Sequence, residues 1–247
     1  MNRLLKMTWM EAKLFLREPA SAFFTLVFPL IYLFMYGAIS GNEPTPMYGG
    51  RGTIDAAIPS LTAVIISMTG LMSTTITMAT YREKGILRRL RTTPVRPLIV
   101  LAAQVIVVFA MTCLGMLLLI AAGKLVYHVR FEGNAFSVLG GFVLSSLSFF
   151  GIGFILAGSM LTVRTAWVVA MVLLYPMLFL SGAFFAVDLL PAAVQKVSAF
   201  MPLTYVVNLL GGLWTGEPWS QHTTDAIVLA VLLVAGVLIS IKTFRWE

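Results

Sequence analysis

Residues Leu98–Ala122 read LIVLAAQVIVVFAMTCLGMLLLIAA and contain no aspartate, glutamate, lysine, arginine or histidine. The most polar side chain in this run is Gln104. A helix needs about 20 predominantly apolar residues to cross the hydrocarbon core of a bilayer, and this run exceeds that length. The run therefore predicts a membrane-spanning helix.

Five further runs on either side of it have the same character. The chain as a whole is 59% hydrophobic and only 11% charged, with a mean hydropathy of +0.94, whereas about a quarter of the residues in a soluble domain are charged. The composition therefore excludes a soluble globular domain and predicts an all-α polytopic membrane protein, with residues 1–247 forming one transmembrane domain. The five further spans are predicted at Ala20–Ile39, Ile58–Thr80, Phe136–Leu161, Ala166–Val187 and Ala226–Ile241.

The lysines and arginines are distributed unevenly between the predicted loops. Six spans place both termini on one side, and 13 of the 17 basic residues lie on that side. Basic residues near span ends mark the cytoplasmic face. We therefore expect a multi-pass protein of the bacterial inner (cytoplasmic) membrane with both termini in the cytoplasm. The net charge of +7 is explained by this topology, and no nucleic-acid partner is expected.

The first 19 residues differ from a typical secretory signal peptide. Their charges are spread through the segment, and the apolar run that follows is long enough to span a membrane. Apolar and small residues recur at helical spacing, which predicts an amphipathic helix lying in the membrane interface or a short anchor of the terminus. Pro19 is expected to turn the chain from the surface into the bilayer. The residues of the predicted apolar stripe are Leu4, Leu5, Thr8, Ala12, Phe15 and Leu16.

The predicted spans lack the ionisable groups on which ion-coupled transporters and intramembrane enzymes depend. The chain also has no phosphate-binding loop of the form Gly-x-x-x-x-Gly-Lys-Ser/Thr. Cys113 lies in a predicted span, and His128 and His222 lie in predicted loops, where they form no recognisable ligand set. We therefore expect no catalytic residue, metal or cofactor in this chain. If it transports a solute, a separate ATPase has to supply the energy.

The stretch Tyr81–Pro94 collects five basic residues and one acid between the second and third spans. Helical spacing would place Ile86, Leu87 and Leu90 together, so the stretch predicts a short helix that ends at Pro94. One interpretation is a positively charged anchor that contacts lipid phosphates. A second is a docking element for a cytoplasmic partner, which Glu83, Gly85 and the Thr93-Pro94 exit favour because an anchor needs none of them.

The segment from Asp188 to Asp225 is too polar to span a membrane. It still contains two apolar runs, Leu189–Val197 and Leu203–Leu213. We expect these runs to form short helices that dip partway into the outer leaflet. Backbone at that depth has to be buried in protein or line a wet cavity.

Two motifs stand out in the loops. The first is Arg82-Glu83-Lys84-Gly85 followed by Leu90 and Thr93-Pro94. The second is Ser181-Gly182-Ala183-Phe184-Phe185, Leu190-Pro191 and Met201-Pro202-Leu203-Thr204-Tyr205. Both resemble the ABC-2 type permease family, the membrane subunits of ATP-binding-cassette exporters that include daunorubicin-resistance, nodulation and polysaccharide export permeases. With the six spans and the amphipathic N-terminus, the resemblance covers essentially the whole chain. The chain departs from the family pattern at Ala186, Asn208 and Gly211, which leaves the substrate subclass open.

The resemblance implies a coupling helix at residues 81–94, which docks on a cytoplasmic ATPase, and re-entrant outer helices within residues 188–225. It implies a homodimer or heterodimer of permease subunits bound to two ATPase subunits, which hold ATP and magnesium. The residues that it implies to face the ATPase are Glu83, Gly85, Ile86, Leu87, Arg88, Arg89, Leu90 and Arg91.

The resemblance further implies export of a hydrophobic or amphipathic compound such as a drug, an antibiotic or a lipid-like molecule. Phe150, Phe154, Met160 and Phe179 are candidates for the substrate path, because large flexible apolar side chains make adaptable contacts. Two alternatives stay open. One is export of a polysaccharide or lipid-linked glycan, and the other is a non-transporting membrane scaffold or sensor that recruits a partner through residues 81–94.

Overall fold

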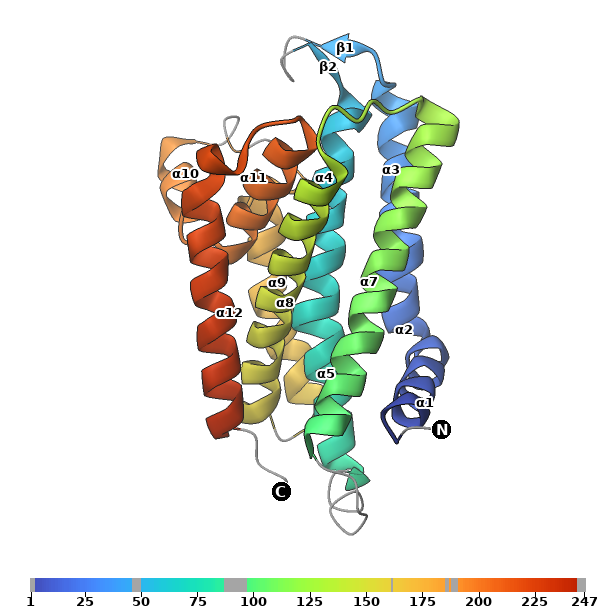
Figure 1. The fold of residues 1–247 in the computed structure, drawn as a ribbon, viewed down its shortest axis with the longest axis vertical. Helices are drawn as coiled ribbons and strands as arrows, with labels where there is room; N and C mark the ends of the chain where they lie inside the picture. The colour runs from blue at the N-terminus through green and yellow to red at the C-terminus, as the bar shows by residue number, and fades with distance from the viewer. Residues whose placement is uncertain are drawn as a thin grey trace.

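A computed structural model describes residues 3–45, 50–86, 97–160, 162–184, 187 and 191–243. Within these residues six helical segments are long and apolar enough to cross a membrane, which confirms the predicted all-α architecture with six spans. The segments stand side by side in one bundle (Figure 1). They are Phe23–Ser40, Thr53–Glu83, Ile99–Tyr127, Ala135–Ser159, Val163–Leu180 and Trp219–Ser240.

The bundle has a hairpin end and an α1 end. The hairpin end carries β1 (Pro44–Thr45) and β2 (Arg51–Gly52), which pair antiparallel. The α1 end carries α1, and the last residues of α12 reach the same end (Figure 1). The helices are α1 (Arg3–Arg17), α2 (Pro19–Ala22), η1 (Phe23–Val27), α3 (Phe28–Ser40), α4 (Thr53–Ser67), η3 (Met68–Ser73), α5 (Thr74–Glu83), α7 (Pro97–Tyr127), α8 (Ala135–Ser159), α9 (Val163–Leu180), α10 (Ala192–Ser198), α11 (Pro202–Trp214), η5 (Trp219–His222) and α12 (Thr223–Thr243).

The bounds of all six predicted spans differ from those in the structure. The third span continues to Tyr127 instead of ending at Ala122, and the last begins at Trp219 instead of Ala226. The second runs from Thr53 to Glu83 instead of from Ile58 to Thr80. Asp55 caps its start by accepting the Gly52 amide, and its end lies just before Gly85, which has a left-handed φ of 65°. The fifth ends at Leu180 rather than at Val187. Gly182 has a φ of 88°, a left-handed conformation that glycine adopts readily just after a helix.

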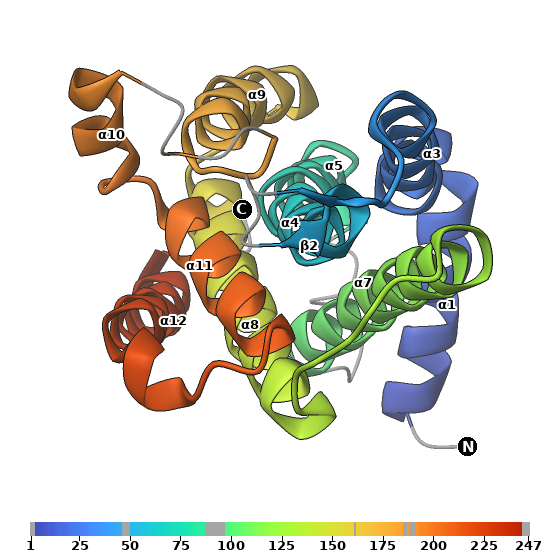
Figure 2. The ribbon, with the colours of Figure 1, turned by 90° about the horizontal axis from the view of Figure 1, so that it is seen from above.

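The second span occupies the centre of the bundle. In its most apolar stretch 89% of the residues are buried inside the protein, compared with 28% for the third span and 11% for the last. Figure 2 shows α4 and α5 between α3, α7, α8 and α9. Because helix association in a membrane depends on packing and polar contacts, this central helix is the scaffold on which the other spans are placed.

Both η1 and η3 are π-helical turns inside spans, and they contact each other. In η1 the π-type hydrogen bonding is explained by Pro29, because proline has no N–H to donate to the carbonyl four residues earlier. The amide of Phe28 instead donates to the carbonyl oxygen of Phe23, five residues back. The corresponding step in η3 is the bond from the Thr74 amide to the Thr69 carbonyl. π turns of this kind interrupt a helix locally without ending it.

Glycines let α8 approach two neighbours at backbone distance. A Cβ added at Gly153 would overlap the carbonyl oxygen of Gly70 in η3, and a Cβ at Gly236 in α12 would lie 2.7 Å from the Cα of Gly151. Ser148 adds a hydrogen bond of 2.7 Å to the Leu229 carbonyl of α12. Small residues and hydroxyl hydrogen bonds of this kind hold helices together where no hydrophobic driving force acts between them.

At the hairpin end the buried carboxylate of Asp55 joins three segments. Its Oδ2 accepts the amide of Gly52 at 3.1 Å, which caps the start of α4. Its Oδ1 accepts the Asn42 side-chain amide at 3.0 Å and the Arg130 backbone amide at 3.1 Å. Asn42 also donates to the carbonyl of Tyr127 at 3.1 Å. These bonds fix the ends of the first three spans relative to one another.

Replacing Asp55 with alanine should destabilise this end of the bundle. The change leaves three donors without their acceptor, and we expect a loss of about 3 kcal/mol in folding free energy, because hydrogen bonds to a charged group are strong and their buried partners are costly to strand. Thermal unfolding of the purified chain in detergent measures the effect. Asp55→Asn keeps one acceptor oxygen and should lose less, and equal stability of the alanine variant and the wild type would contradict this interpretation.

The segment after the fifth span folds as the two predicted short helices. α10 and α11 meet at 90° around Ala199–Met201, and together they form either a broken span or a re-entrant loop. Leu189 and Leu190, at the start of the first predicted run, and Phe185 and Ala186 lie outside the described residues. α11 is largely buried against α4, α8 and α12, so its backbone is covered by protein.

Helix α1 confirms the predicted N-terminal helix but corrects its buried face. Met7, Glu11 and Phe15 lie one turn apart and are buried, and α1 packs against α7. Of the predicted stripe, Leu4, Leu5 and Leu16 are exposed and Phe15 alone is buried. The prediction was misled by Glu11, a charged residue that lies on the inward face. The exposed leucines are suited to contact lipid. The location of α1 in the membrane interface stays a prediction.

Candidate functional site

The site begins where the second span ends, at Arg82, Glu83, Lys84 and Gly85. Helix α5 stops at Glu83, and Gly85 has a φ of 65°, so it takes the left-handed conformation that ends many helices. The amide of Gly85 donates to the Arg82 carbonyl at 3.0 Å. The predicted helix from Tyr81 through Thr93 is therefore wrong at its start, because the helix of the second span ends before Gly85.

Glu83 caps the start of α9, the helix of the fifth span. Its Oε2 accepts the backbone amide of Val163 at 2.6 Å, and Val163 is the first residue of α9. The first amides of a helix lack partners within the helix, and its dipole favours a negative charge there. Within the subunit, the side chain of Glu83 is thus directed at the turn between the fourth and fifth spans.

Arg82 binds the other side of the same turn. Its Nη1 donates to the carbonyl oxygens of Ala157 at 2.8 Å and Met160 at 2.6 Å. These carbonyls belong to the end of α8, where the last carbonyls lack amide partners and a positive charge is favourable. Two consecutive residues of opposite charge therefore hold the end of α8 and the start of α9. We call Arg82 and Glu83 with these contacts the Arg82–Glu83 clamp.

The other residues predicted to face an ATPase divide into two groups. Ile86 packs with Leu101 and Phe154 around the buried cluster of Met78, Tyr81 and Ala157. Among the described residues, no atom lies within 4 Å of a Cβ added at Gly85. With respect to these residues, the left-handed backbone turn, and not a close contact, explains the glycine at this position. Leu87, Arg88, Arg89, Leu90 and Arg91 lie outside the described residues, and their role stays a prediction.

The four predicted substrate-path residues are not brought together. Phe150 is 2% exposed and lies in the core. Phe154 packs beside Ile86, and the carbonyl of Met160 accepts a bond from Arg82, so both lie near the Arg82–Glu83 clamp. Phe179 is 52% exposed, and its ring lies 6.0 Å from that of Phe184. Of these four candidates, Phe179 alone is well exposed on the surface of this subunit.

Next to Phe184, a hollow of about 620 Å³ opens between α3, α4, α11 and the start of α12. Tyr32 and Phe184 form one wall, with ring centroids 4.9 Å apart. Asn208 and the backbone around Gly182 contribute polar atoms to the lining. The first part of the second sequence motif, Ser181–Phe184, therefore lines an aromatic and polar hollow toward the hairpin end.

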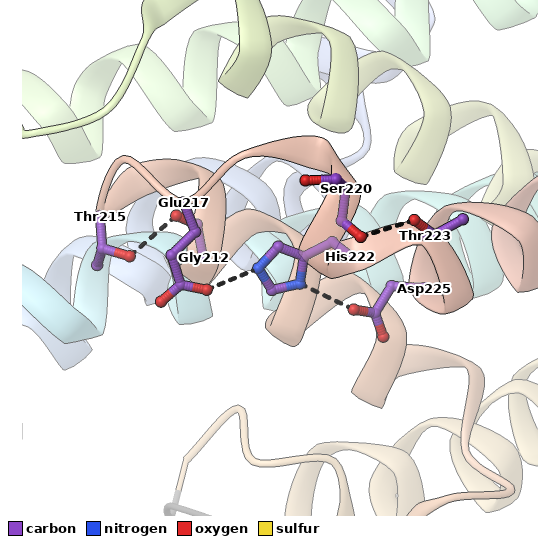
Figure 3. A network of polar contacts seen from close by, with 7 residues as sticks. All are labelled: Gly212, Thr215, Glu217, Ser220, His222, Thr223 and Asp225. Carbon is purple, nitrogen blue, oxygen red and sulfur yellow. Dashed lines mark hydrogen bonds and ion pairs between the residues drawn. The ribbon is translucent and has the colours of Figure 1, made fainter.

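His222 lines this hollow, and Figure 3 shows its ring between the carboxylates of Glu217 and Asp225. Its Nδ1 lies 3.0 Å from Asp225 Oδ2 and its Nε2 lies 2.9 Å from Glu217 Oε2. A Cβ at Gly212 would overlap the imidazole ring. With both nitrogens held by carboxylates, His222 ties the loop after α11, which carries Glu217, to Asp225 in the first turn of α12. This histidine, which the sequence places in a loop, therefore has a structural role.

At the α1 end, a buried hydrogen bond joins α1 to the second span. Tyr81 donates its hydroxyl proton to Glu11 Oε2 at 2.5 Å, and Glu11 is 3% exposed. Burial raises the pKa of the Glu11 carboxyl above its ordinary value, and the bond from Tyr81 partly offsets this effect. The sequence carried a signal for this residue, because Met7, Glu11 and Phe15 recur every four residues. Arg82 belongs to the first sequence motif, but the sequence assigns no contact to it, and Glu11 belongs to no motif.

Glu11 should make the stability of the protein depend on pH. The folded state favours its neutral form, so stability is greatest at low pH and falls as pH rises above the ordinary pKa of a glutamate, about 4.5. Glu11→Gln keeps an acceptor for Tyr81 and removes the charge. We expect the variant to be more thermostable than the wild type at pH 8 and equal to it near pH 4. Glu43→Gln, at an exposed position, is the control, and a constant difference across pH would contradict the prediction.

Residues 2–213 match the family model described as ABC-2 type transporter. The chain is 40% identical to nodulation protein J of Rhizobium leguminosarum bv. viciae over 70 residues, which are 28% of this chain and 27% of that protein. It is 23% identical to a candidate transport permease of Porphyra purpurea, ycf38, over 86% of this chain and 73% of that protein. It is 27% identical to a candidate multidrug ABC transporter permease of Escherichia coli strain K12, YbhS, over 64% of this chain and 42% of that protein. The matched regions thus span less than half the length of two of these relatives.

Proposed function

Because this chain belongs to the ABC-2 type transporter family, we propose that it exports a hydrophobic or amphipathic compound, such as a drug, an antibiotic or a lipid-like molecule. The chain is a multi-pass membrane permease, and in this proposal it moves the compound out of the cytoplasm or the inner leaflet. It works in the bacterial inner membrane with both termini in the cytoplasm, which makes the α1 end the cytoplasmic end.

The proposal includes partners that supply energy and complete the pathway. Two cytoplasmic ATPase subunits bind ATP and magnesium, and a second permease copy, identical or related, completes the dimer. The stretch that begins at Glu83 docks on the ATPase, and this chain itself holds no cofactor. Coupling then requires that movement of this stretch reaches the spans.

The observation that carries the proposal is the Arg82–Glu83 clamp. It ties the start of the charged stretch to the end of α8 and the start of α9 through bonds of 2.6 to 2.8 Å. A force applied just after Gly85 is therefore passed to the second, fourth and fifth spans together. Packed helices respond to such a force as rigid bodies, and an anchor for lipid phosphates would need no such linkage.

The chemistry of the surfaces supports an apolar or amphipathic substrate. The exposed Phe179 and the aromatic wall of Tyr32 and Phe184 lie next to the hollow of about 620 Å³. Aromatic walls with a few polar groups are typical of small-molecule sites. The multidrug designation of YbhS points in the same direction.

Transport by the reconstituted complex tests the proposal. The chain is copurified with a candidate ABC ATPase partner, and ATP-driven movement of a fluorescent hydrophobic dye is followed in proteoliposomes. We expect dye transport that requires ATP and magnesium, with dye-stimulated ATP hydrolysis. Stimulation by a lipid-linked glycan instead would favour glycan export, and a stable protein without any ATPase partner would favour a scaffold.

Leu87→Asp should uncouple transport from ATP hydrolysis. A charge at an apolar docking residue disfavours insertion into a pocket of the partner, so we expect about a ten-fold loss of ATP-driven transport with normal membrane insertion. Leu125→Asp, at a residue that is 80% exposed at the hairpin end of α7, is the matched control. Full transport by the Leu87 variant would contradict the docking role.

A further inference from the structure

A second cavity lies at the α1 end, apart from the Arg82–Glu83 clamp and the aromatic hollow. Its volume is about 380 Å³, and it is enclosed by α1, α5 and the first turns of α7. Leu14 and Phe15 of α1 and Val107 and Val108 of α7 form apolar walls. The cavity is large enough for a headgroup together with the first carbons of an apolar chain.

The floor of this cavity carries buried polar atoms that lack partners. Gln104, 2% exposed, has neither its Oε1 nor its Nε2 hydrogen-bonded within the described residues. Glu11 uses Oε2 for Tyr81, and its Oε1 is likewise buried without a partner among these residues. Both side chains line the cavity. Buried polar groups are nearly always hydrogen-bonded, so such groups around an internal space call for a partner that fills it.

The unpartnered atoms specify which chemistry fits. Two of the three atoms are acceptors, the carboxyl oxygen Glu11 Oε1 and the amide oxygen Gln104 Oε1. The third, Gln104 Nε2, is a donor. Each of the two acceptors requires a donor, and a protonated primary amine offers three N–H donors and a positive charge. A quaternary ammonium of similar size offers no N–H. The donor of the Gln104 amide then requires an acceptor oxygen on the same ligand.

The mouth of the cavity carries the charges Arg17, Glu18 and Lys84. Lys84 lies close enough to Glu18 to oppose the rise in the pKa of this carboxyl that burial causes. These two charges therefore offset one another, whereas the Glu11 carboxyl at the floor has no cation beside it among the described contacts. Arg17 is exposed at the rim, where a cation attracts a phosphate or ester oxygen.

We propose that this cavity binds an amphiphile whose headgroup carries a protonated primary amine, with the amine donating to Glu11 Oε1 and Gln104 Oε1. The apolar chain leaves between Leu14 and the valines of α7 toward the lipid. Two sources share this chemistry, an aminophospholipid of the surrounding leaflet and a solute that is an alkylamine. The inference goes beyond the proposed function, because it concerns binding by the chain itself without ATP or a partner.

Binding to the purified full chain in detergent tests the proposal. The probes are phosphatidylethanolamine, phosphatidylcholine with the same acyl chains, and a long-chain primary alkylamine, each followed by displacement of a fluorescently tagged phosphatidylethanolamine whose amine is free. We expect phosphatidylethanolamine to compete about ten-fold better than phosphatidylcholine, since trimethylation removes the N–H donors. If phosphatidylethanolamine competes and the alkylamine does not, the site binds an aminophospholipid. If both compete equally, the site recognises the primary amine whether it belongs to a lipid or to a solute.

Two variants locate the effect in this cavity. Gln104→Leu removes both unpartnered groups at similar volume, and Glu11→Gln removes the charge while keeping an acceptor for Tyr81. Each should weaken phosphatidylethanolamine binding about ten-fold and leave phosphatidylcholine binding unchanged. Gln221→Leu, an exposed glutamine near the hairpin end, is the matched control. Equal affinity for the amine and trimethylammonium lipids, or unchanged binding by both variants while they remain folded, would overturn the proposal.

Discussion

Glu83→Arg is expected to abolish most ATP-driven transport while the protein still inserts and folds. The change removes the acceptor of the Val163 amide and places a positive charge at the positive end of the α9 helix dipole. The linkage between the charged stretch and α9 is then broken and replaced by repulsion. We expect transport to fall about ten-fold or more, measured in proteoliposomes against the amount of correctly inserted protein.

Three further variants separate the contact from the charge. Glu83→Gln keeps an acceptor oxygen and should retain most transport. Val163→Pro removes the amide donor at the first position of a helix, where proline is tolerated, and the extended conformation of Thr162 suits a following proline. In the proline background, Glu83→Gln should have little further effect. Glu43→Arg repeats the charge change at an exposed site, and wild-type transport by Glu83→Arg would exclude the clamp from coupling.

Gly153→Ala is expected to be the most destabilising single methyl addition in the described helices. The new Cβ would overlap the carbonyl oxygen of Gly70, a backbone atom that cannot rotate away. The fourth span would have to separate from the second, which is at the centre of the bundle. Overpacking of a rigid interior costs about 3 kcal/mol at its upper end, so we expect a large drop in melting temperature in detergent and a loss of folded protein.

The matched control for this change is Gly211→Ala in α11. Among the residues that the structure describes, no atom lies within 4 Å of a Cβ at this position, and alanine is a better helix former than glycine. We expect the Gly211 variant to be as stable as the wild type or slightly more stable. Comparable melting temperatures for the Gly153 and Gly211 variants would show that the contact with Gly70 relaxes without cost.

The Arg82–Glu83 clamp and the contact between Gly153 and Gly70 both join the second span to its neighbours. Gly153 and Gly70 bring the fourth span against the second at backbone distance, and Arg82 and Glu83 join the same two spans, together with α9, at the α1 end. Thr75 adds a hydrogen bond of 3.2 Å to the Gly153 carbonyl. The second, fourth and fifth spans are thus connected as one unit, and the charged stretch is attached to its end.

Much of this arrangement follows from the sequence and much of it does not. The number of spans follows from apolar runs such as Leu98–Ala122, because the thickness of the bilayer sets the length of a crossing helix. The end of α5 could have been predicted from Gly85, since glycine is the residue that a left-handed helix end selects. The two short helices after the fifth span follow from their apolar runs and from Pro202 at the start of α11.

The partners of charged residues did not follow from the sequence. The sequence places Arg82 in a basic stretch, and the resemblance implies that Glu83 faces an ATPase; only the fold shows that they bind the ends of α8 and α9. Glu11 is one of the charges spread through the N-terminal segment, yet its side chain lies inward against Tyr81. In each case the partner is about 70 to 80 residues away along the chain, so no local pattern could identify it.

By itself the sequence determined that this chain is a bundle of six spanning helices with a charged connection after the second. These properties depend on transfer of apolar side chains into lipid, which is local and nearly additive along the chain. Only the tertiary structure decided which span lies at the centre, which glycines touch, and which carboxylates face inward. These depend on close packing and on hydrogen bonds between distant segments, where a shift of one turn exchanges every partner.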